Sequence, residues 1–178
     1  MQIVRVRDKT ADYIKRHASD IGNKLGSKIT VKDETVSIDG LGNEEERTLQ
    51  EFLGQKVIKA LDGGLKLEDA AKLMNEEYAM KVIDLKEMGY AQGVINRHIG
   101  RVIGEDGRAK RMLEKSADVK IGVTEHQIAV LGKFEDVDIA IEAIMRLVSG
   151  SPHKNVYRYI DEGMARLERK EAEEEFGD

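Results

Sequence analysis

The chain has 178 residues, 40% of them apolar and 35% charged, with no cysteine and a formal net charge of −5. The lack of cysteine excludes disulfides and cysteine-ligated zinc, and the four histidines lack the spacing of a metal site, so we expect no metal and no cofactor. No segment is apolar and long enough to cross a bilayer, and the N-terminus does not resemble a signal peptide, which favours a cytoplasmic protein.

The first 25 residues are predicted to form a strand followed by a helix. Residues 3–7 are predicted to form the opening strand, because apolar and charged side chains alternate from Val4 to Arg7, as in a half-buried strand. Apolar residues then recur at three- and four-residue spacing, which predicts one amphipathic helix from about Thr10 to Leu25. This apolar stripe consists of Ala11, Ile14, Ala18, Ile21 and Leu25.

An internal repeat begins after this helix and recurs 92 residues later. Residues 28–40 and 120–132 each contain two alternating segments joined by a short polar turn, which predicts a β-hairpin in each copy. An amphipathic helix is expected to follow each hairpin. The same offset aligns Lys28 and Ile29 with Lys120 and Ile121, Val31 with Val123, Val36 with Ile128, Ile38 with Val130, Leu49 with Ile141 and Phe52 with Ile144.

The two copies suggest two domains joined by a short helical segment. A glycine-containing break at 62–64 is followed by a helix expected from about Glu68 to Tyr78. We therefore expect one domain over residues 1–75, including this helical segment, and a second over residues 76–160.

A Gly-x-x-Gly turn between two predicted helices distinguishes the second copy. The segment 99–111 reads I-G-R-V-I-G-E-D-G-R-A-K-R, and residues 97–111 contain five basic residues against Glu105 and Asp106. Glycine at both ends of the turn lets the backbone approach a phosphate, and the helix that follows would direct its free N–H groups there. This pattern indicates nucleic-acid binding.

The first copy lacks this turn. At the same offset its residues are Asp12, Tyr13, Ile14 and Lys15, which lie within the predicted N-terminal helix. Because about three residues separate the opening strand from that helix, the sequence leaves no room for a separate first helix and a phosphate-facing loop.

The C-terminal part is predicted to be a helix with an acidic end. Ser151 and Pro152 are typical of a helix start, and the acidic tail at 161–178 holds eight acidic and three basic residues. These five excess negative charges equal the net charge of the whole chain, so residues 1–160 are neutral overall. The net charge therefore does not oppose a locally basic region around the Gly-x-x-Gly turn.

Residues 80–150, with the V-I-G-E-D-G turn followed by Leu113, Ile121 and the second hairpin, resemble a KH domain. The whole arrangement, including G-R-V-I-G-E-D-G-R-A-K-R and the later Gly150-Ser151-Pro152-His153, is similar to the archaeal KH proteins related to the eukaryotic partner-of-Nob (Pno/Dim) ribosome-assembly factor. The resemblance implies an α+β fold of tandem type I KH domains. In each, a three-stranded sheet would pack against helices, with a degenerate first copy.

The same resemblance implies binding of single-stranded small-subunit ribosomal RNA near its 3′ end during maturation. It also implies contact with a maturation endonuclease and with the alpha subunit of archaeal initiation factor two. A KH domain clamps about four unpaired nucleotides by their backbone. By position, the residues of the clamp would be Gly104, Glu105, Asp106 and Gly107. The phosphate contacts would be Arg101, Arg108, Lys110 and Arg111, and the groove for the bases would have Ile103, Ile121 and Val123 in its floor. Weaker candidates are Arg97, His153, Asn155 and Tyr157, and for the last three, which follow the turn at Gly150, packing or helix capping is the favoured role.

An enzyme and a protein-interaction scaffold are the two alternatives to an RNA-binding protein. An enzyme is disfavoured because neither a nucleotide-binding glycine motif nor a nucleophile with an adjacent base is present. The stronger alternative is a protein-interaction scaffold in ribosome assembly or translation initiation with incidental RNA binding, which the degenerate first copy and the acidic tail favour.

Overall fold

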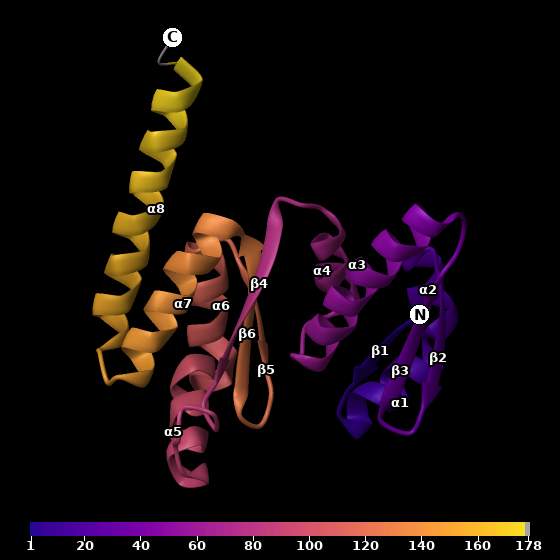
Figure 1. Ribbon diagram of the computed structural model, residues 1–178. Helices are drawn as coiled ribbons and strands as arrows, with labels where there is room; N and C mark the ends of the chain where they lie inside the picture. Colours follow the sequence, from indigo (N-terminus) through magenta and orange to yellow (C-terminus); the bar gives the residue numbers. More distant parts are fainter. Residues whose placement is uncertain (177–178) are drawn as a thin grey trace. The chain divides into compact units, whose positions relative to one another are not determined.

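A computed structural model describes residues 1–176, which form two compact units divided between Glu76 and Glu77. Each unit contains its own three-stranded antiparallel sheet covered by helices, as Figure 1 shows. The chain is thus an α+β protein with two separate sheets rather than one continuous sheet.

The first unit has the sheet order β1-β3-β2. Its elements are β1 (Gln2–Arg5), α1 (Asp8–Arg16), α2 (Ala18–Leu25), β2 (Ser27–Lys32), β3 (Thr35–Gly40), α3 (Glu44–Asp62), α4 (Leu67–Ala70) and the 3-10 helix η1 (Ala71–Met74).

The second unit repeats this order in β4-β6-β5, with β5 at an edge of the sheet. Its elements are β4 (Tyr78–Asp84), α5 (Gln92–Ile103), the 3-10 turn η2 (Glu105–Gly107), α6 (Arg108–Ser116), β5 (Lys120–Val123), β6 (Gln127–Lys133), α7 (Phe134–Val148) and α8 (His153–Phe176).

The register of the hairpins confirms the 92-residue repeat. In the first unit Ile29 is paired with Ile38, and in the second unit Ile121 is paired with Val130, each residue lying 92 positions after its counterpart. Because side chains alternate across a strand, identical registers place the same positions on the buried face. The repeat is therefore a structural duplication.

The predicted continuous helix from Thr10 to Leu25 is wrong, because the chain breaks at His17 between α1 and α2. His17 has φ −113° and ψ 17°, and its N–H donates to the carbonyls of Tyr13 and Ile14. The apolar stripe resumes in α2 with nearly the same phase, so periodicity alone does not reveal the break. The segment 12–15 lies inside α1, so the first unit has no glycine loop there.

The predicted alignment of the helices after the hairpins is also wrong. Leu49 and Phe52 are 58% and 52% exposed, whereas Ile144 is fully buried. The cause is the connection: α7 begins directly after β6, but three residues separate β3 from α3, whose N-terminus has a capping box between Asn43 and Glu46. The constant offset therefore ends with the hairpin.

Two further boundaries differ from those expected. The helical segment expected to reach Tyr78 ends at Met74, because β4 begins at Tyr78. The expected division at residue 160/161 lies inside α8, which continues to Phe176, so residues 161–176 of the acidic tail belong to that helix.

Helix α8 packs on α7 in the second unit (Figure 1). A side chain at Gly163 would meet Ile139 of α7 at 3.1 Å, and the Arg146 guanidinium lies 3.9 Å from the centre of the Tyr159 ring. No helix among the described residues is long and apolar enough to span a membrane.

Asp84 at the end of β4 fixes the start of the loop toward α5. Its Oδ2 accepts from Gln127 Nε2 at 2.7 Å, and its Oδ1 accepts from the N–H groups of Lys86 and Glu87. Burial acts to raise the pKa of Asp84, but these hydrogen bonds and the nearby His126 outweigh it, so the pKa lies below its usual value.

A carboxylate with a lowered pKa stabilises the fold above the pKa it has in the unfolded chain, and this stabilisation is lost as the pH falls through the lower folded value. We therefore expect the free energy of unfolding to fall as the pH drops below about 4, and to fall less in Asp84→Asn. Denaturant unfolding at a series of pH values tests this, and equal pH dependence in both proteins would contradict it.

Candidate nucleic-acid interface

The turn between α5 and α6 is held from both sides by the core. Val102 in the last turn of α5 is fully buried, and Ala109 and Leu113 of α6 are 6% and 1% exposed. Glu105 and Asp106 between them are exposed. The core thus fixes the two ends of the turn and leaves its tip at the surface.

Gly104 has a conformation and a location that exclude a side chain. Its φ of 71° and ψ of 177° lie in a region used almost only by glycine. A Cβ built there would lie 2.6 Å from the Cβ and 2.8 Å from the backbone N of Ala109. The first glycine is therefore required for α5 and α6 to approach each other this closely.

Asp106 and Gly107 are both left-handed, with φ values of 51° and 73°. A Cβ at Gly107 would meet only the flexible guanidinium of Arg111, at 3.1 Å, so this position is less crowded than Gly104. Gly107 provides no side-chain cap for α6. The turn therefore presents bare backbone next to the positive end of a nine-residue helix.

The structure separates the five basic residues of segment 97–111 into two groups. Arg97, Arg108 and Arg111 are exposed, and Nη1 of Arg111 donates to the carbonyl of Asp106 at 2.8 Å, which braces the turn. Arg101 instead donates from Nη2 to the carbonyl of Ser151 at 2.8 Å. This hydrogen bond attaches α5 to the start of α8, and the phosphate contact of Arg101 stays a prediction.

Lys110 also has an intramolecular partner, Glu114, one turn later in α6. Lys110 Nζ lies 3.8 Å from Glu114 Oε1, and the same oxygen accepts from the N–H of Ile121 in β5 at 2.9 Å. Glu114 was not among the predicted site residues. The sequence signal for it is the four-residue spacing from Lys110, which favours an ion pair on a helix.

The three apolar groove candidates have different environments. Ile103 is half-buried and Val123 is partly buried against the core, whereas Ile121 is only 2% exposed. The prediction that the Ile121 side chain lines an open groove is therefore wrong, because this side chain belongs to the core. Ile121 offers its backbone at the sheet edge.

The weaker candidates at the start of α8 differ in their contacts. His153 Nε2 lies 2.9 Å from the carbonyl oxygen of Arg101, and Tyr157 packs against the core, where burial raises its pKa. Asn155 is exposed, and its N–H donates to the carbonyl of Pro152. His153 and Tyr157 thus have packing roles, as favoured from the sequence.

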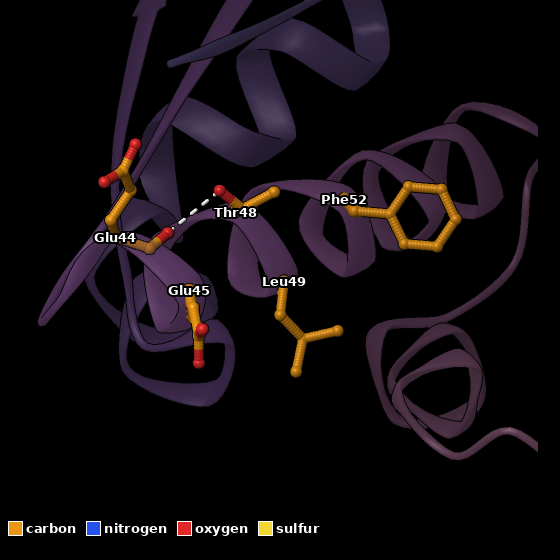
Figure 2. Close-up of a pocket in the computed structure, with 5 residues that line it drawn as sticks. All are labelled: Glu44, Glu45, Thr48, Leu49 and Phe52. Atoms are coloured by element: carbon orange, nitrogen blue, oxygen red, sulfur yellow. Dashed lines mark hydrogen bonds between the residues drawn. The ribbon is translucent and has the colours of Figure 1, made fainter.

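A second surface feature lies on α3 of the first unit. Glu44, Glu45, Thr48, Leu49 and Phe52 line a shallow pocket, in which Leu49 and Phe52 are exposed (Figure 2). Lys56 Nζ lies 4.6 Å from the centre of the Phe52 ring. No group of three or more potential metal-ligating side chains occurs among residues 1–176.

Comparisons with known proteins connect this geometry to a family of domains. Residues 79–165 match the model of the second KH domain of PNO1, described as a eukaryotic-type (type I) KH domain. The KH domain-containing protein MJ0443 of Methanocaldococcus jannaschii is 28% identical over 92% of this chain and 78% of its own length. The pre-rRNA-processing protein PNO1 of Coccidioides immitis is 30% identical over 75% of this chain and 53% of its own length. The chain thus spans about half of that fungal relative.

Solved structures extend the likeness to both units. A crystal structure of an Aeropyrum pernix protein of unknown function superposes with a TM-score of 0.89 and 29% identity, covering 99% of this chain and 96% of that one. The Dim2p chain in the a/eIF2alpha-aDim2p-rRNA complex of Pyrococcus horikoshii gives a TM-score of 0.80 and 26% identity, covering 90% and 92%. The homologues are archaeal KH proteins and PNO1 proteins, and the fold is of the KH type.

The unequal crowding at the two glycines leads to a stability prediction. Gly107→Ala should cost about 1–2 kcal/mol, because a left-handed conformation is strained for alanine. Gly104→Ala should cost about 1–3 kcal/mol more, because the added carbon also meets the backbone of Ala109. Chemical denaturation of both variants measures the difference, and equal destabilisation would contradict the assigned geometry.

Proposed function

We propose that this chain, a homologue of archaeal Dim2p and of the PNO1 pre-rRNA-processing proteins, binds single-stranded ribosomal RNA through the turn from Gly104 to Gly107. The single observation that carries the proposal is the bare backbone of this turn, which the core holds at the surface at the start of α6. The solved complex of the Pyrococcus horikoshii relative with rRNA supports RNA as the ligand class.

In this mechanism the phosphates and the bases are bound by different groups. The N–H groups at the start of α6 and the exposed Arg108 and Arg111 would hold the RNA backbone, which positions the strand without reading its sequence. Bases would lie toward the edge strand β5. No bond is made or broken, so the chain would act as a binding protein rather than as an enzyme.

The acidic residues of the turn oppose this binding without preventing it. Glu105 and Asp106 are exposed, so their charges are screened by solvent and their side chains can point away from a phosphate. The backbone carbonyl of Asp106 accepts a hydrogen bond from Arg111, which holds a positive charge at the tip of the turn. Net attraction would come from the exposed arginines and from the helix dipole.

The RNA segment that we propose is the 3′ region of the small-subunit ribosomal RNA, bound during maturation. The support is the likeness to PNO1, whose name places it in pre-rRNA processing, and to Dim2p in its rRNA complex. A maturation endonuclease acting at that 3′ end would then be a neighbour of the bound chain.

Gly107→Asp tests the clamp. Three aspartates of this chain, at positions 33, 106 and 118, already have φ values near 50°, so a left-handed aspartate at 107 should fold. We expect at least a tenfold loss of affinity for a short single-stranded RNA from the small-subunit 3′ end, because the new carboxylate would face a phosphate. Fluorescence anisotropy at fixed, moderate salt measures this.

Gly107→Asn is the matched control, because it has the same shape and tolerates the same backbone conformation without the charge. It should bind RNA within about threefold of the wild type if the loss in Gly107→Asp comes from charge repulsion. If the wild type and Gly107→Asp bind equally while both are folded, the clamp is not the RNA site and the scaffold alternative gains support.

We also propose a protein partner, the alpha subunit of archaeal initiation factor two, because the Pyrococcus horikoshii relative was solved in complex with a/eIF2alpha. Calorimetric titration of this subunit into RNA-free wild type and Gly107→Asp should give the same affinity, since the clamp is not needed for a protein contact. Absence of binding to either protein, both without RNA and with RNA added, would refute the partnership. Binding only when RNA is present would make it RNA-mediated.

A further inference from the structure

Strand β5 has an edge whose hydrogen-bonding groups are not used by the sheet. Among residues 1–176 it pairs only with β6, and the N–H of Ile121 is directed away from β6 toward α6. Alternate residues of a strand direct their backbone groups to the same side, so Val123 faces the same edge. This edge is where a base would find backbone donors and acceptors.

Glu114 accepts a hydrogen bond from the first of these donors, the N–H of Ile121. Its backbone carbonyl accepts from the N–H of Val119 at 3.1 Å, and its side-chain Oε1 accepts from the N–H of Ile121 at 2.9 Å. A ligand approaching β5 at Ile121 therefore meets a carboxylate before it meets the backbone N–H.

The carboxylate is held in place by surrounding groups. A negative charge in the last turn of a helix is disfavoured by the helix dipole, so Glu114 depends on its partners, which are Ile121 and Lys110. Both contacts are made by Oε1. The side chain is 19% exposed, and a carboxylate has about four acceptor positions, so acceptor capacity remains toward the solvent.

We propose, on the basis of the RNA binding proposed above, that Glu114 is a specificity-determining residue that selects bases with an exocyclic amino group. A carboxylate accepts a hydrogen bond from cytosine N4, and adenine N6 is a donor of the same kind. Uracil has a carbonyl oxygen where cytosine has the amino group, so its acceptor would face the acceptor of Glu114. Lys110, 35% exposed beside the carboxylate, can donate to a ring carbonyl or a phosphate.

The test compares short RNAs that differ at one chemical group. The wild-type chain should bind a cytidine heptamer about tenfold more tightly than a uridine heptamer, within the range for one well-placed base contact. Glu114→Gln should bring the two Kd values within about twofold. The amide can still accept from Ile121, and its NH₂ group can donate to uracil O4.

Glu105→Gln is the matched control, because it removes one negative charge from the turn without touching β5. It should tighten binding of both heptamers alike and leave their ratio unchanged. If Glu114→Gln behaves in the same way, Glu114 acts only by charge repulsion and the proposal is overturned.

A measurement on the unaltered protein keeps the proposal testable if Glu114→Gln does not fold. A heptamer of N4,N4-dimethylcytidine lacks the amino donors, so wild-type affinity for it should fall to that of the uridine heptamer. Undiminished affinity would refute the role of Glu114. If the wild type binds no RNA at all, the RNA-binding function fails, whereas equal binding of cytidine and uridine heptamers refutes only the selectivity.

Discussion

The second unit depends on the close approach of Gly104 to the start of α6. Because the space that a Cβ would need is filled by Ala109, α5 and α6 can follow each other across a four-residue turn, with Val102 and Leu113 both in the core. The turn stays at the surface because the residues at its two ends, Val102 and Ala109, are buried in the core. Its backbone is therefore exposed by the packing beneath it, and a ligand does not have to displace a side chain to reach it.

The two units show how much of this scaffold survives without the turn. The hairpin registers are the same, yet in the first unit the chain from Asp8 onward enters α1 directly and breaks only at His17. That unit also has a buried core, which includes Ile14, Ile21 and Ile38, so its sheet and helices pack together without a glycine turn. The turn is therefore a feature of the second unit alone, which agrees with the role in RNA binding proposed for it.

The parts that could be predicted from the sequence are those governed by local alternation. The hairpins and their register follow from the two-residue period, which a sheet with one buried face enforces. The helix positions after them could not be predicted in the same way, because the connection before α3 is longer than the one before α7 and rotates Leu49 and Phe52 to the surface. Helical periodicity predicts which face of a helix is apolar, but not which other element packs against that face.

The site was predictable where it depends on backbone and not where it depends on side-chain partners. The glycines identify the turn in the sequence. The basic residues beside it predict phosphate contacts, but the sequence does not show that Arg101 donates to Ser151 or that Lys110 lies beside Glu114. Glu114 could not be assigned because its role depends on β5 being an edge strand, which is a property of the sheet order. Unpaired strand edges favour association with other chains, and a carboxylate over Ile121 blocks such pairing. The contact that protects this edge in the free protein thus also determines which chemical groups can approach it.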